Sequence, residues 1–221
     1  TSIMLAVLVT TAAISWSFAG PLMTLISYIG IAAAGISSVV TFGFWMPFIG
    51  FIVNPRPHLA PRTWLIFAAG EGFFIGSISL VFETMFPGIV LEAVSLTFCV
   101  AATLLFLYKS GLVKPSQNFV LMLCSAIFGI FLFYIGVFIY SLVTGTSPEI
   151  FSGSSNFSIG LSLFVVGMAA LSLVLDFDII EQSAERGSPK YMEYFGAMAL
   201  VTTLVWLYIE ILRLLAKFRS R

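Results

Sequence analysis

Leu171–Ile180 reads LSLVLDFDII, and it ends a long apolar run with two carboxylates, Asp176 and Asp178. The chain has only ten acidic residues among 221, so two of them at the edge of a hydrophobic segment are unusual. A charged side chain in hydrocarbon is costly, and such residues usually carry function. Glu210, inside the last hydrophobic segment, is the first partner that we expect for these acids.

The composition indicates a membrane protein. The chain is 60% hydrophobic and 9% charged, whereas an ordinary soluble domain carries about 25% charged residues. The apolar residues form long unbroken runs rather than the short alternating segments of a transmembrane barrel. We therefore expect an all-α membrane protein in contact with the lipid bilayer. The formal net charge of zero argues against a nucleic-acid partner.

A spanning helix needs about 20 apolar residues, and seven runs approach or exceed that length. The predicted helices are 2–18, 22–53, 63–82, 88–108, 119–143, 157–180 and 191–217. We expect the first to be a membrane helix rather than a signal peptide, because no basic residue precedes it and another apolar run follows directly. Residues 1–221 are predicted to form a single seven-helix transmembrane domain.

Helical geometry places the two carboxylates of Leu171–Ile180 on different faces of the helix. At 3.6 residues per turn, Asp176 and Asp178 lie about 200° apart. Gly160 and Gly167 share the face of Asp178, whereas the face of Asp176 carries Ser158, Ser162, Ala169 and Ser172. Small residues mark places where membrane helices approach closely. We therefore expect both carboxylates to point along packing seams rather than at lipid.

Three further charged residues are candidates. Glu71 lies beside Gly72, and its position suits structural hydrogen bonding and an ion path equally. Glu92 is about one turn into its helix, where it either complements the helix N-terminus or lines an ion path. Arg213 follows Glu210 by one turn, so it either pairs with that acid or extends towards the end of its helix.

Enzyme chemistry finds little support. The only histidine, His58, lies in a proline-rich loop, whereas a zinc enzyme needs several converging ligands. Cys99 and Cys124 lie in apolar runs and are interpreted as small buried hydrophobes. We expect no enzyme and no resident metal or cofactor. Carboxylate oxygens suit the transient passage of a hard cation such as Ca²⁺.

Two close carboxylates in a low dielectric share a proton. Such a pair closes through a hydrogen bond, and deprotonation or a cation opens it. A pair of this kind is a physical basis for a pH-sensitive gate.

Several motifs together resemble the transmembrane Bax inhibitor motif family, in particular its bacterial members. Gly88–Thr97 (GIVLEAVSLT) looks like the fourth-helix segment of that family, and Ala69–Gly76 (AGEGFFIG) like a subgroup of bacterial homologues. Phe177-Asp178 is similar to the Tyr-Asp motif that ends its sixth helix. Trp206–Leu215 (WLYIEILRLL) is similar to its last-helix pattern. The resemblance covers most of the chain.

The resemblance implies seven helices with the last one central among the other six. It also implies a pH-sensitive calcium leak, gated by acids that correspond here to Asp178 and Glu210. Glu replaces Asp at position 210, and Asp176 is a rival for Asp178. Counting from the connecting loop, straight antiparallel helices would place the Asp178 and Glu210 carboxylates about 20 Å apart in depth.

The resemblance leaves a second function open. Some members of the family are implied to be non-transporting regulators of a membrane-bound protease or of a stress response. The apolar runs and the resemblance to bacterial members together imply a multi-pass protein of the bacterial inner membrane.

The basic residues give a mixed indication of orientation. The loops after the second, fourth and sixth predicted helices carry basic residues, and those after the first, third and fifth carry none. Basic loops favour the cytoplasmic side. Seven full spans then place Lys217, Arg219 and Arg221 on the opposite side. Either this basic tail departs from the rule, or the seventh segment does not cross fully.

Overall fold

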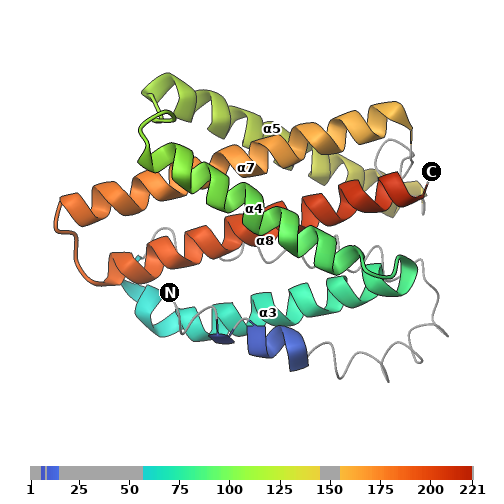
Figure 1. Ribbon diagram of the computed structural model, residues 1–221, viewed down its shortest axis with the longest axis horizontal. Coiled ribbons are helices and arrows are strands. Elements are labelled where there is room, and N and C mark those ends of the chain that lie inside the picture. The colour runs from blue at the N-terminus through green and yellow to red at the C-terminus, as the bar shows by residue number, and fades with distance from the viewer. Residues whose placement is uncertain (1–5, 8, 15–56, 145–154, 221) are drawn as a thin grey trace. The chain divides into compact units, whose positions relative to one another are not determined.

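The computed structural model describes residues 6–7, 9–14, 57–144 and 155–220, and over these residues it contains helices and turns but no strand (Figure 1). Residues 6–7 and 9–14 are helical, within the first predicted helix. The helix predicted over residues 22–53 lies outside the described residues. Five of the described helices are long and apolar enough to cross a membrane. The number seven stays a prediction.

The described helices follow the apolar runs closely. They are η1 (Pro57–Leu59), α3 (Ala60–Met85), α4 (Ile89–Lys109), α5 (Gln117–Thr144), α7 (Asn156–Glu185) and α8 (Tyr191–Arg219). A chain in lipid must satisfy its backbone polar groups internally, so an unbroken apolar run favours one continuous helix. This is why most helix ends lie within a few residues of their predicted positions.

The ends of α7 and the start of α4 show what stops a helix. Ser155 caps α7, and its hydroxyl accepts a hydrogen bond from the Ser158 amide at 3.2 Å. Gly88 precedes α4 with a φ of 86°, a left-handed conformation that favours glycine. The predicted end of α7 at Ile180 is wrong. The helix continues to Glu185, because charged residues also form helix readily once the chain leaves the apolar run.

The chain divides into two units, which are described separately. Unit 1 comprises Thr1–Met85 and Ser188–Thr202, and unit 2 comprises Phe86–Gly187 and Thr203–Arg221. The single transmembrane domain stays a prediction. In unit 1, the rings of Trp64 on α3 and Tyr194 on α8 lie 6.3 Å apart between centroids.

Three small residues of α3 are buried. Ala68, Gly72 and Gly76 lie four residues apart along the helix and share a face. Small buried residues at this spacing let a neighbouring helix approach closely.

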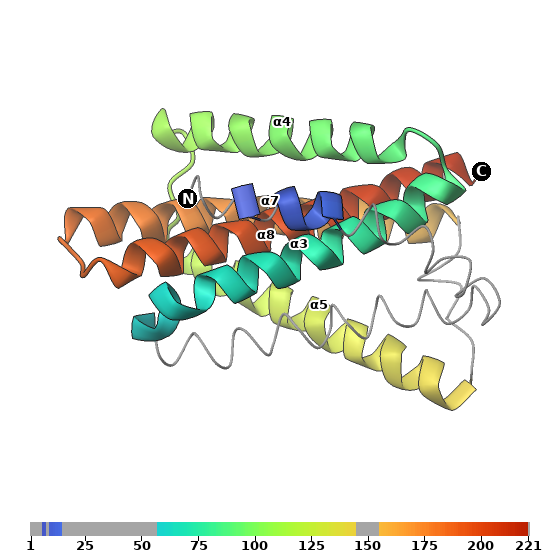
Figure 2. The same cartoon turned by 90° about the horizontal axis from the view of Figure 1, so that it is seen from below.

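In unit 2, α7 packs against α4 and α5 (Figures 1 and 2). The C-terminal half of α8 runs antiparallel to α7, since the end of α8 contacts the beginning of α7. Val205–Leu212 are eight consecutive buried residues, so this part of α8 is enclosed on every face. A central helix requires this burial, although its place among seven helices stays a prediction.

Two expectations about burial are wrong. Gly160 and Gly167 are exposed, and a Cβ atom added at either would meet no atom of the described residues within 4 Å. Within the part of the chain that the structure describes, the glycine face of α7 is therefore not a close-packed seam, because the helix instead buries the face whose hydroxyls find partners. Cys99 and Cys124 are exposed on α4 and α5, where an apolar side chain suits contact with lipid.

Candidate functional site

Three polar residues of α8 in unit 2 recur at a fixed spacing. Thr203, Glu210 and Lys217 are seven residues apart, which is close to two helical turns and about 10 Å of rise. They therefore lie on nearly the same face of α8. Each of them has a polar partner on a neighbouring helix of the unit.

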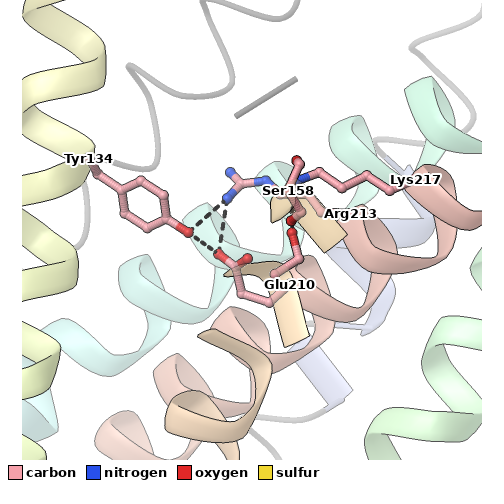
Figure 3. A network of polar contacts seen from close by, with 6 residues as sticks. Tyr134, Ser158, Glu210, Arg213 and Lys217 are labelled. Carbon is pink, nitrogen blue, oxygen red and sulfur yellow. Dashed lines mark hydrogen bonds and ion pairs between the residues drawn. The ribbon is translucent and has the colours of Figure 1, made fainter. Parts of the chain in front are cut away.

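The middle of this face is a three-residue network (Figure 3). Glu210 is 2% exposed, and its Oε1 atom accepts hydrogen bonds from Arg213 Nη1 at 3.0 Å and from Tyr134 Oη at 2.8 Å. Arg213 also donates to Tyr134 Oη at 3.3 Å, and its guanidinium lies 5.6 Å from the centre of the tyrosine ring. The predicted pairing of Arg213 with Glu210 is therefore present, and Tyr134 joins α5 to it.

The C-terminal end of the face is occupied by an ammonium group. Lys217 Nζ donates to Ser158 Oγ at 2.8 Å, to Ser162 Oγ at 2.7 Å and to the Ser158 carbonyl at 3.3 Å. Figure 3 shows Lys217 beside Ser158, close to the Glu210 network. Both serines are buried. Their burial confirms the serine face of α7 as a packing face.

Asp176 lies at the other end of that serine face and is 9% exposed. Its carboxylate lies near the Thr203 side chain of α8. The second oxygen, Oδ2, is buried and has no hydrogen-bond partner among the described residues. A buried carboxylate oxygen without a donor is costly, so this atom is suited to receive a proton or a cation.

We call these residues the polar seam: Ser158, Ser162, Ser172 and Asp176 of α7, with Thr203, Glu210 and Lys217 of α8. The four residues of α7 are all buried. The contacts at Thr203 and Lys217 show that the two helices face each other at both ends of the seam.

Asp178 belongs to a different group of residues. Its Oδ1 atom accepts a hydrogen bond from Tyr108 Oη at 3.2 Å, and its Oδ2 atom accepts one from Gln182 at 2.6 Å. Glu181 also contacts Tyr108 Oη, so the two carboxylates share its single hydroxyl proton. These contacts join the C-terminal ends of α4 and α7, where Asp178 is only partly buried.

The structure does not bring Asp178 and Glu210 together in a hydrogen bond. The contacts Asp176–Thr203 and Ser162–Lys217 fix the register of the antiparallel helices. In this register Glu210 lies opposite Ala169, nine residues from Asp178, or about 13.5 Å of helix rise. Each acid thus has its own hydrogen-bond partners, and the direct pair implied by the resemblance stays a prediction.

Neither Glu71 nor Glu92 belongs to the polar seam. Glu71 is buried on the face of α3 that carries Gly72, within unit 1. Glu92 is exposed near the start of α4 and forms an ion pair with Arg219 at 2.6 Å. Arg219 also donates to the Pro87 carbonyl at 2.7 Å. Glu92 thus connects the start of α4 to the end of α8.

Sequence reasoning missed Lys217, Tyr134 and Tyr108. The spacing of Lys217 from Glu210 and Thr203 is a signal that could have found it. The two tyrosines carry no such signal, because they contact acids 70 and 76 residues away along the chain.

The fold and the site together define an integral membrane protein of long apolar helices, with a buried polar seam between two of them. The family model described as Bax inhibitor 1 like matches residues 1–220. The chain therefore belongs to the Bax inhibitor family, as the motifs indicate. Comparison with curated proteins and with solved structures gave no match.

Proposed function

We propose that this protein is a cation leak, with Ca²⁺ as its cargo, in the inner membrane of a bacterium. The family supports the class of function, and the polar seam supports the route. In this proposal the ions follow the seam between α7 and α8, and Asp176 and Glu210 are the acids that bind them in turn. Carboxylate and hydroxyl oxygens are the ligands that hard cations prefer.

The length of the polar seam carries the proposal. From Ser158 to Asp176 the α7 helix rises about 27 Å, close to the roughly 30 Å thickness of the hydrocarbon core. Along α8, Thr203, Glu210 and Lys217 provide a polar group every two turns. A buried polar line of this length has a large desolvation cost, and an ion path is a function that accounts for it.

Asp176 supports a dependence on pH. Its Oδ2 atom has no donor among the residues that the structure describes, so in a low dielectric either a proton or a cation neutralises it. The two compete for the same atom. Acidification favours the proton, so the flux of Ca²⁺ should fall as the pH is lowered.

The test is Ca²⁺ flux into liposomes that contain the purified protein, followed with an entrapped indicator. Asp176→Asn should lower the flux by roughly tenfold, the factor that a binding loss of about 1.4 kcal/mol produces, and should flatten its pH dependence. Glu185→Gln, a matched change of an exposed acid at the end of α7, should leave both unchanged. Wild-type protein without flux at any pH would refute the proposal.

The variant Asp178→Asn tests whether Asp178 or Asp176 controls the flux. Asp178 is bound by Tyr108 and Gln182 away from the polar seam, so its variant should retain flux and pH dependence. Loss of both in Asp178→Asn, with Asp176→Asn resembling wild type, would assign the gate to Asp178 instead.

One observation favours the alternative of a non-transporting regulator of a membrane protease or stress response. Glu210 already has a cation and a hydroxyl as partners, as expected of an acid that fixes helix packing. In that case a partner protein should co-purify stably, and the Asp176 and Glu210 variants should change the thermal stability without any ion flux.

A further inference from the structure

The contacts of Lys217 are those of a bound cation. An ammonium group has three N–H donors, and Lys217 Nζ contacts three oxygen atoms, which are the hydroxyls of Ser158 and Ser162 and the Ser158 carbonyl. The two serines are 0% and 6% exposed. Three oxygens from buried residues therefore converge on the ammonium group and bind it without the help of any free ion.

The Lys217 ammonium lies at the N-terminal end of α7, which is an unfavourable place for a positive charge. Ser158 lies in the first turn of α7, and the N-terminal end of a helix disfavours a positive charge. Arg213, one turn before Lys217, adds a second repulsive charge. An ammonium group is therefore held there by the three oxygens, with the Glu210 carboxylate two turns away as the nearest compensating charge on α8.

We propose that Ser158 and Ser162 form a cation site at one end of the polar seam, and that the Lys217 ammonium is a tethered cation that occupies it and closes that end. This proposal deepens the proposed leak and rests on it for its effect on flux. The ligand class is a primary ammonium or a monovalent metal ion, because the three oxygens carry no formal charge to balance Ca²⁺.

Tethering explains why the site stays occupied. A group attached to the same chain acts at a high effective concentration, so a free cation competes poorly against it. Removal of the side chain should leave the oxygen site open to the polar seam. A small ammonium ion of the missing shape should then fill it again.

The test compares Lys217→Ala with wild type in liposomes. The variant should leak faster by roughly tenfold, the factor that loss of one charge-assisted hydrogen bond produces. n-Propylammonium, which replaces the deleted atoms, should restore a low leak, whereas tetramethylammonium, without N–H donors, should not. Lys109→Ala is the matched control, because Lys109 is an exposed lysine at the end of α4.

A second measurement tests the site independently of transport. A ligand that binds only the folded state raises the melting temperature, so n-propylammonium should raise the Tm of Lys217→Ala. It should not raise that of the triple variant Ser158→Ala, Ser162→Ala, Lys217→Ala. An unchanged Tm in Lys217→Ala would overturn the site.

The flux outcomes separate the two proposals. A wild-type leak that Lys217→Ala does not increase would overturn the closing role while leaving the proposed function intact. A faster leak that n-propylammonium fails to reduce would also overturn that role. A leak in neither protein, with the Tm shift present, would confirm the cation site and refute the leak together with its closure.

Discussion

At the scale of single residues, Arg213 holds a buried negative charge in place. Glu210 has the lowest exposure of the acids that the structure describes, and its Oε1 atom receives hydrogen bonds from Arg213 and Tyr134. Arg213→Met would leave a carboxylate without its cation in a low dielectric. We expect the free energy of unfolding to fall by roughly 3 kcal/mol, measured by denaturation in detergent micelles.

Two further variants check the cause of that loss. Glu210→Gln combined with Arg213→Met removes both charges, so it should be less destabilised than Arg213→Met alone. Arg219→Met breaks the partly exposed ion pair with Glu92 and should cost no more than about 1 kcal/mol. Equal losses in Arg213→Met and Arg219→Met would mean that burial of the Glu210 charge does not matter.

At the scale of the helix, α7 has one face that packs and one that does not. No described residue lies within 4 Å of a Cβ atom added at Gly160 or Gly167, whereas Ala169 on the serine face is 0% exposed. Gly160→Ala and Gly167→Ala should therefore leave the Tm unchanged or slightly raised. Ala169→Leu should destabilise by about 1–3 kcal/mol through overpacking.

These three variants are measured by thermal unfolding in the same detergent. Leu163→Ala, at an exposed apolar position of α7, is the control for a change of side-chain size on the open face. A loss of stability in Gly167→Ala as large as that in Ala169→Leu would show that the glycine face does pack.

The helices are also the scale at which the sequence predicts best. An apolar run specifies a membrane helix because the backbone has no other way to satisfy its polar groups. Residue spacing correctly placed Asp176 on a buried face with Ser158 and Ser162. It failed for Gly160 and Gly167, because small residues permit close approach without providing a neighbour.

At the scale of the whole molecule, the polar contacts depend on how distant segments meet. Tyr134 and Glu210 are 76 residues apart in sequence, and a single sequence does not distinguish this tyrosine from the six others. For Asp178, by contrast, the sequence indicates the residue but not its partners. Its motif is recognisable, yet its partners are decided by the lengths of α4 and α7, which bring Tyr108 to the same level.

The same contacts bear on membrane orientation. Tyr108 joins the C-terminal ends of α4 and α7, while Lys217 and Arg219 join the end of α8 to the beginnings of α7 and α4. Lys217 is bound by serines, and Arg219 is paired with Glu92. These basic residues are therefore used in packing, and their presence at the end of α8 is a weak signal for the cytoplasmic side.

The length of α8 and the lysines beside the α4–α5 loop predict the membrane orientation. With 29 residues, α8 is about 43 Å long, enough to cross the roughly 30 Å hydrocarbon core. The exposed Lys109 and Lys114 beside the α4–α5 loop then place that loop in the cytoplasm and the end of α8 on the opposite side. In a Cys99→Ala, Cys124→Ala background, Ser220→Cys should react with an impermeant maleimide in intact cells. Leu112→Cys should react only after the cells are opened, and the reverse pattern would refute this orientation.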